Sequence, residues 1–92
     1  MRTQTHSLDS ILGLLDRFHQ RASYGAVAEL IDRPAQYLMN GRPRNPRHSW
    51  IVSKDTWLPT GYFEDQVHPD IISRDRVLLS AEELESWLQN PS

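Results

Sequence analysis

Pro34 constrains the fold of this chain more than any other residue in its sequence. A stretch with helical character from about Tyr24 to Asp32 ends just before it, because proline lacks the amide hydrogen that a continuing helix would use. Proline is well tolerated in the first turn of a helix, so a second helix is expected to open at Pro34 and to stop at Gly41. Two short helices around a tight turn predict a helix-turn-helix over about 24–41.

Two further helices are expected, one near each end of the chain. Ser7 is placed to cap the first, whose buried face follows helical spacing: Leu8, Ile11, Leu12, Leu15 and Phe18. The last helix is expected over about 80–89, because Ser80 and Glu83 stand at the spacing of a capping box. Its inward side is expected to hold Leu84, Trp87 and Leu88.

The segment after Pro46 has the composition of β-structure. Residues 49–53 are rich in β-branched and aromatic side chains, and residues 54–56 suit a turn before the next apolar pair. A small β-hairpin is therefore predicted within about 49–62. Residues 1–92 are expected to form one domain, mainly α with a small β-hairpin, arranged as a winged helix-turn-helix.

Charge is distributed unevenly along the chain. Residues 55–92 carry a net charge of −6 and residues 1–32 a net charge of −1, within an overall charge of −2. Residues 33–54 contain no carboxylate and five cations: Arg33, Arg42, Arg44, Arg47 and Lys54. A positive patch beside an acidic flank is typical of a phosphate-binding surface on a small protein, although a solvated basic loop would have the same composition.

Composition excludes several classes of site and location. The chain has no cysteine, which rules out disulfides, thiolate metal ligands and a thiol nucleophile, and which is compatible with a reducing cytosol. No apolar run approaches the ~20 residues needed to cross a bilayer, and no hydrophobic signal segment opens the chain. We therefore expect a cytoplasmic protein with no membrane partner.

The central segment resembles a known family of DNA-binding proteins. The residues Ser-Tyr-Gly-Ala-Val-Ala at 23–28, then Pro34 followed by Gly41, then Asn45-Pro46, look like the DNA-binding domain of alkylguanine-DNA alkyltransferases and alkyltransferase-like proteins. The resemblance covers roughly residues 8–62 and is most specific over 23–46. It implies a helix-turn-helix that enters the minor groove of double-stranded DNA and turns a damaged base out of the stack, without a cofactor.

The chain departs from this family at the positions that carry its chemistry. Residues 47–50 read Arg-His-Ser-Trp where the family has Pro-Cys-His-Arg, so His48 stands at the reactive cysteine. Alkyl transfer to sulfur is thereby excluded, and we expect a non-catalytic protein. The family's intercalating arginine falls on Leu38, which is interpreted as an apolar wedge between base steps or, alternatively, as a core residue.

The candidate DNA-binding residues belong to the helix-turn-helix and to the basic exit over 42–48. Tyr24 matches a family tyrosine beside the rotated phosphate and stands where a helix begins, a position that favours a phosphate. The amides and phenol of the second helix suit base edges or sugars, and the arginines, held extended by two prolines, suit phosphates. The predicted set is Tyr24, Arg33, Gln36, Tyr37, Leu38, Asn40, Arg42, Arg44, Arg47 and Lys54. Neutralisation of five phosphates predicts a log–log salt slope of about −4.5.

A base pocket is expected next to this surface. His48 and Trp50 are candidates for stacking on a base, although Trp50 on a short strand also suits a hydrophobic core. Thr60 and Gly61 resemble the loop that lines the lesion pocket of the family.

Two alternative functions are compatible with the acidic C-terminal half. One is a metal-dependent nucleic-acid hydrolase, in which the carboxylates and imidazole of Glu64, Asp65, His68 and Asp70 hold a divalent cation. The other is a protein-interaction module, in which the acidic surface and the tryptophans dock on a basic partner.

Overall fold

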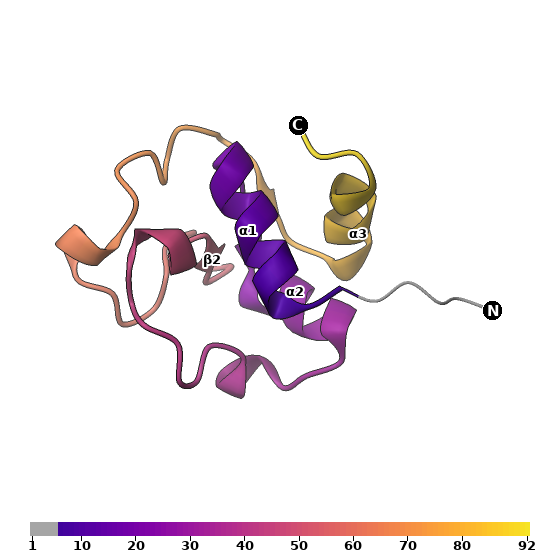
Figure 1. Ribbon diagram of the computed structural model, residues 1–92, viewed down its shortest axis with the longest axis horizontal. Helices are drawn as coiled ribbons and strands as arrows, with labels where there is room; N and C mark the ends of the chain where they lie inside the picture. The colour runs from indigo at the N-terminus through magenta and orange to yellow at the C-terminus, as the bar shows by residue number, and fades with distance from the viewer. Residues whose placement is uncertain (1–5) are drawn as a thin grey trace.

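Residues 6–92, which the computed structural model describes, form three α-helices and a three-stranded parallel sheet (Figure 1). The first five residues of the predicted domain lie outside this range. Helix α1 (Leu8–Phe18) begins as predicted: the Ser7 hydroxyl accepts a hydrogen bond from the Ser10 amide at 3.1 Å. Its apolar face is buried at Leu8, Ile11, Leu12 and Leu15, and the helix ends at His19 in the left-handed conformation.

Helix α2 (Tyr24–Ile31) forms the first half of the predicted helix-turn-helix. Ser23 caps it by accepting a hydrogen bond from the Ala26 amide at 3.0 Å. The helix ends at Asp32, whose left-handed φ of 58° turns the chain out of the helix two residues before Pro34. Small side chains on its buried face allow α2 to pack closely against α3 (Ala81–Gln89).

The predicted second helix is wrong as a full α-helix. The chain forms one 3₁₀ turn, η1 (Ala35–Tyr37), followed by further turns up to Gly41, where φ is +78°. Pro34 stays outside the turn in an extended conformation, with ψ at 129°. The amides that follow make i to i−3 bonds, from Tyr37 to the Pro34 carbonyl at 3.1 Å and from Leu38 to the Ala35 carbonyl at 3.2 Å. The structure therefore does not confirm a winged helix-turn-helix.

The predicted β-hairpin is also wrong. Strand β2 (Ile51–Val52) pairs in parallel with β1 (Arg21–Ser23), and β3 (Val77–Leu78) pairs in parallel with the other edge of β1. The sheet order is β2-β1-β3, with Ala22 opposite both Ile51 and Leu78. The residues after β2 make a tight loop, in which the Ser53 amide donates to the Leu58 carbonyl at 3.0 Å, but they add no strand.

Helix α3 (Ala81–Gln89) confirms the predicted C-terminal helix. The Ser80 hydroxyl accepts a hydrogen bond from the Glu83 amide at 3.1 Å, while the Glu83 carboxylate faces the amide of Leu79 at 3.3 Å. Leu84 and Leu88 are buried, and Trp87 is half-buried with its ring edge-to-face against Phe18 of α1.

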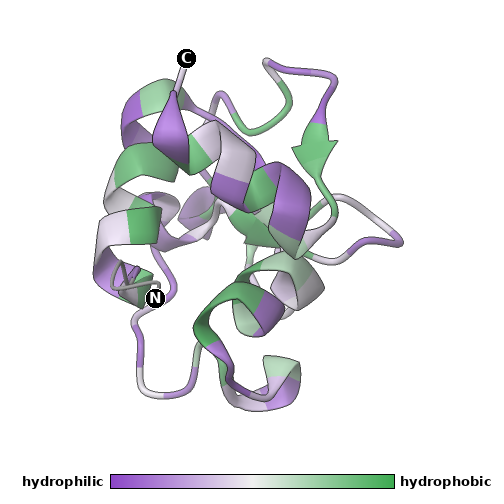
Figure 2. Cartoon of the chain, turned by 90° about the vertical axis from the view of Figure 1, so that its right-hand side faces the viewer, coloured by the Kyte–Doolittle hydropathy of each residue, from purple (hydrophilic) through white to green (hydrophobic). Residues whose placement is uncertain are grey.

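The core lies where the three helices cover the small sheet. Figure 2 shows that the helices carry apolar and polar residues on different sides, as expected for elements packed on a shared core. The largest fully buried side chains are Trp50, Ile11, Leu12, Leu15, Ile51, Leu78, Leu84, Val27 and Val52.

Residues 53–76 connect β2 to β3 as a long, mostly irregular segment on the left of Figure 1. Buried Arg21, beside the core, holds this segment: its guanidinium donates to the carbonyl of Trp57 at 2.9 Å and to that of Arg74 at 2.7 Å. Gln20 adds a bond from its amide to the Arg76 carbonyl at 2.8 Å. The side chains of Arg21 in β1 and of Gln20 just before it therefore donate hydrogen bonds to loop carbonyls that have no partner in the sheet.

Within residues 6–92, none of the helices has the length and apolar character required to traverse a lipid bilayer.

Candidate nucleic-acid interface

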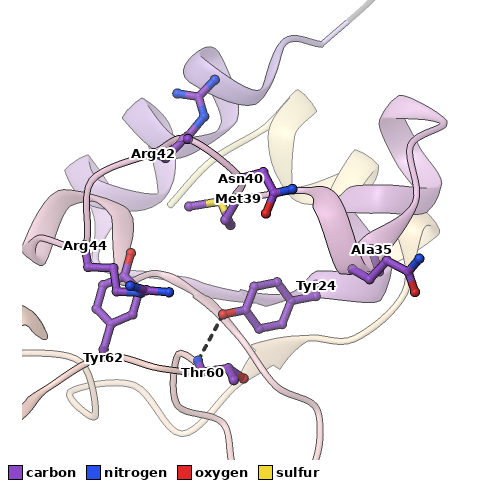
Figure 3. Close-up of a pocket in the computed structure, with 10 residues that line it drawn as sticks. Tyr24, Ala35, Met39, Asn40, Arg42, Arg44, Thr60 and Tyr62 are labelled. Atoms are coloured by element: carbon purple, nitrogen blue, oxygen red, sulfur yellow. Dashed lines mark hydrogen bonds between the residues drawn. The ribbon is translucent and has the colours of Figure 1, made fainter.

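A pocket of about 550 Å³ opens where α2 begins (Figure 3). Three stretches distant in sequence form its wall: the first residue of α2, the segment 35–44 and the loop 60–62. The lining residues are Tyr24, Ala35, Gln36, Met39, Asn40, Gly41, Arg42, Arg44, Thr60 and Tyr62. This lining includes two arginines and no carboxylate, so its charge favours an anionic ligand.

Two tyrosines hold the loop 60–62 against the rest of the pocket. The Tyr24 hydroxyl accepts a hydrogen bond from the Thr60 amide at 3.0 Å, the bond drawn dashed in Figure 3. The Tyr62 hydroxyl donates to the His48 carbonyl at 3.0 Å. Burial raises the pKa of Tyr62, and nearby Tyr24 raises it further while Arg44 lowers it, so this phenol stays protonated at neutral pH.

Arg44 extends into the pocket from the basic exit (Figure 3). Its guanidinium packs on Gly61, where a Cβ atom would lie 3.6 Å from Nε. Gly61 has a φ of +78°, in the left-handed region that glycine adopts without strain. The exposed Arg44 is therefore a cation held at the pocket by contact with a tight turn.

Arg42 has a different environment. Its side chain points away from the pocket centre in Figure 3, and its Nη1 atom makes an ion pair with the carboxylate of Asp9 on α1. The Arg42 side chain is 27% exposed and the Asp9 side chain 75% exposed. Because this pair neutralises one cation at the edge of the pocket, a phosphate would have to compete with Asp9 for it.

The three other predicted cations lie outside the pocket lining. Arg33 follows the end of α2, Lys54 follows β2, and both are exposed. Exposed Arg47 runs along α1, since a Cβ atom at Gly13 would lie 3.7 Å from its Nη2 atom. None of the three contributes to the wall of the pocket.

The predicted base-contacting residues divide into exposed and buried ones. Gln36 and Asn40 are exposed and line the pocket, while Tyr37, 60% exposed, stands outside the lining. Leu38 is only 3% exposed and belongs to the core cluster. The interpretation of Leu38 as a DNA wedge is therefore wrong, because it fills the core beneath the η1 turn.

The predicted base pocket is only partly assembled. Thr60 lines the pocket and Gly61 adjoins it, whereas Trp50 is fully buried and its indole N–H donates to Asp16 at 2.9 Å. The expected stacking of a base on Trp50 is wrong, because both faces of its ring lie inside the protein. His48 is half-buried outside the lining, with Nδ1 2.7 Å from the Asn45 side-chain oxygen.

The charge around His48 disfavours its protonation. Burial lowers the pKa of His48, and the neighbouring cations Arg42 and Arg47 lower it further, against weaker opposing effects of Asp9 and Asp16. The neutral ring can donate through Nδ1 to the Asn45 oxygen, which also accepts the His48 backbone amide at 3.1 Å.

Four residues of the pocket wall were not predicted from the sequence, among them Gly41, which was expected only to end a helix. The other three, Tyr62, Met39 and Ala35, line the pocket beside predicted residues. The position of Tyr62 directly after Thr60-Gly61 was the available signal, because a side chain next to a turn that lines a pocket tends to share it. Met39 and Ala35 carry no comparable signal in sequence.

The predicted metal cluster is rearranged in the structure. His68 and Asp70 come together with His19 at the end of α1, and their donor atoms lie within 4.8 Å of one another. Glu64 and Asp65 are exposed on the 3₁₀ turn η3 (Glu64–Gln66) and are not part of this group. His19 was missed because it lies far from the other two in sequence.

Comparison of the chain with protein-family models, with curated proteins and with solved structures gave no match to any of them.

Proposed function

We propose that this protein binds double-stranded DNA without catalysis, through the pocket in Figure 3 and exposed cations outside its wall. The observation that supports this most is the lining of the pocket: six of the residues predicted to contact DNA or a base meet there, and no carboxylate joins them. They are Tyr24, Gln36, Asn40, Arg42, Arg44 and Thr60.

Each group at the pocket has a role in this proposal. Arg44 binds a phosphate through its planar guanidinium, which matches two phosphate oxygens. The Tyr24 hydroxyl, which only accepts in its bond to Thr60, donates its own hydrogen to a neighbouring phosphate. Gln36 and Asn40 present amides that hydrogen-bond base edges or sugars.

The proposal extends to modified or distorted bases. The volume of the pocket, about 550 Å³, lies within the range of small-molecule sites, about 300–1,000 Å³. A base that is already unpaired or alkylated leaves the stack at lower cost than a paired one, so it would enter such a pocket more readily. Without a cysteine, the protein would hold the base and leave its alkyl group in place.

Fluorescence anisotropy with a labelled duplex tests the proposal. We expect salt-dependent binding to a plain duplex, and tighter binding to the same duplex with an alkylated guanine. The Arg44→Ala variant should reduce the log–log salt slope by about 0.9, because one phosphate contact is lost. Equal affinity for the two duplexes would restrict the function to general DNA binding, and absence of binding to both would refute it.

Arg76→Ala provides the matched control. Arg76 is an equally basic surface residue, but its guanidinium faces Glu83 of α3 at 3.4 Å, away from the pocket lining. Its removal should leave the affinity and the salt slope at wild-type values. A loss of binding equal to that of Arg44→Ala would mean that overall charge, and not the pocket, controls the interaction.

Protein binding is the second candidate function, supported by a separate apolar hollow. This hollow is lined by Arg21, Asp55, Thr56, Trp57, Leu58, Ile72 and Asp75. Ile72 is 71% exposed and Leu58 44% exposed, beside two carboxylates that suit a basic partner. A partner that uses this surface should be lost from pull-downs with Ile72→Ser and kept with Arg44→Ala; the reverse pattern would refute this candidate.

A further inference from the structure

Three rings form a cluster outside the DNA-binding pocket. The His19 ring stacks on Trp50 with centroids 5.2 Å apart and an interplanar angle of 12°. The His68 ring lies 4.8 Å from Trp50 and 4.6 Å from His19. The two imidazoles thus both pack against the buried indole of Trp50.

A carboxylate completes this cluster. The Asp70 Oδ2 atom lies 3.4 Å from Nδ1 of His19, and one donor atom from each of His19, His68 and Asp70 lies within 4.8 Å of the others. Around a tetrahedral Zn²⁺ ion with bonds near 2.0–2.1 Å, neighbouring ligand atoms are separated by about 3.3–3.4 Å. The pair of His19 and Asp70 already has this separation.

We propose that His19, His68 and Asp70 form a binding site for a divalent transition-metal ion of the Zn²⁺ type. Imidazole nitrogen with one carboxylate oxygen is a donor set that suits zinc and its neighbours in the first transition row, and that magnesium and calcium disfavour. Three protein ligands leave one position of a tetrahedral site for water.

Backbone contacts anchor the two imidazoles. His19 is the left-handed C-cap of α1, and its amide donates to the Leu15 carbonyl. The His68 amide donates to the hydroxyl of buried Ser49 at 3.0 Å. The backbone that carries each ring is therefore hydrogen-bonded before an ion binds.

The third ligand has room to adjust. The Asp70 side chain is 55% exposed and that of His19 is 39% exposed, which gives an ion access from solvent. The Asp70 amide donates to Nδ1 of His68 at 3.0 Å, so Nδ1 is the acceptor of this bond. An ion at Nδ1 would replace that N–H, which belongs to an exposed residue and can turn to water.

A bound ion would join two parts of the chain that regular structure does not connect. His19 ends α1, whereas His68 and Asp70 belong to the irregular segment between η3 and β3. Because the ion would bind the folded chain and find no preformed site in the unfolded one, it would stabilise the fold and fix this segment.

Isothermal titration of the tag-free, chelator-treated full chain with ZnCl₂ tests the proposal. We expect one ion per chain, a rise in melting temperature with added Zn²⁺, and no response to MgCl₂. His19→Asn and Asp70→Asn should each weaken Zn²⁺ binding by more than the roughly 10–100-fold that loss of an outer-shell partner costs. Asparagine tolerates the left-handed conformation at position 19, so this variant keeps the helix cap.

His6→Asn and Asp65→Asn are the matched controls, because both lie outside the cluster. They should bind Zn²⁺ as the wild type does. Titration with CoCl₂ gives a second reading, since a tetrahedral site with imidazole ligands produces visible absorption bands that should disappear in His19→Asn. Failure of the wild type to bind Zn²⁺ or Co²⁺, or binding that His19→Asn and Asp70→Asn leave unchanged, would overturn the proposal.

Discussion

Replacement of Asp9 by asparagine should strengthen DNA binding, although this residue lies outside the pocket lining. Asp9 neutralises Arg42, the one pocket-lining arginine for which the described residues show an ion pair. Asp9→Asn keeps the shape of the side chain and removes the charge, so Arg42 becomes available to a phosphate. The variant therefore tests whether the ion pair competes with DNA.

The expected magnitude follows from the exposed cations. If the four exposed residues Arg33, Arg44, Arg47 and Lys54 each neutralise a phosphate, the log–log salt slope of the wild type is about −3.6. Release of Arg42 adds one contact and makes the slope about −4.5. At 0.1 M salt, this single contact increases the affinity by about eightfold.

The stability of the variant should change little. The ion pair is largely on the surface and contributes up to about 1 kcal/mol. Asp9 also lies in the first turn of α1, where a carboxylate contributes about 0.3–1 kcal/mol through the helix dipole. Both effects are smaller than the stability of a typical domain, about 5–15 kcal/mol, so the protein stays folded.

Anisotropy titrations of wild type and Asp9→Asn on one duplex across a salt series provide the measurement. Asp75→Asn is the control, because it removes an equal charge from the apolar hollow and leaves Arg42 paired. Identical slopes for wild type and Asp9→Asn would refute the reasoning that Arg42 is a masked phosphate contact. Equal gains for Asp9→Asn and Asp75→Asn would attribute the effect to net charge alone.

Two predictions concern the fold around the pocket. Asp16→Ala should lower the free energy of unfolding by about 1–3 kcal/mol in urea denaturation, because it leaves the buried Trp50 indole N–H unpaired; Asp16→Asn, which keeps an acceptor, should lose less. The pKa of His48 in the folded chain lies below its usual value. At pH values between this lowered pKa and about 6.5, the unfolded chain binds more protons than the folded chain, so the free energy of unfolding falls as the pH decreases. His48→Gln should flatten this part of the plot of stability against pH relative to wild type. An unchanged plot would contradict the assignment of this pH dependence to His48.

The candidate site was predictable in its residues and not in its shape. The acid-free basic run and the amides near position 40 identified much of the pocket lining, because charge and side-chain chemistry are properties of the sequence. For Leu38 and Trp50 the core alternative was correct and the DNA-contact alternative wrong, and the sequence could not decide between them because it does not show which side of a short turn or strand is buried. His19 was missed because only the fold brings it to His68.

Elements that depend on local interactions could be predicted from the sequence. The cap at Ser7, the end of α2 before Pro34 and the helix α3 all follow from residues within one or two turns of each other. Tertiary structure decided the parallel sheet, in which β1 pairs with strands more than twenty residues away, and it reduced the expected second helix to a turn over the core. Such pairings depend on which apolar surfaces meet when the chain closes, and this information lies in no single segment of the chain.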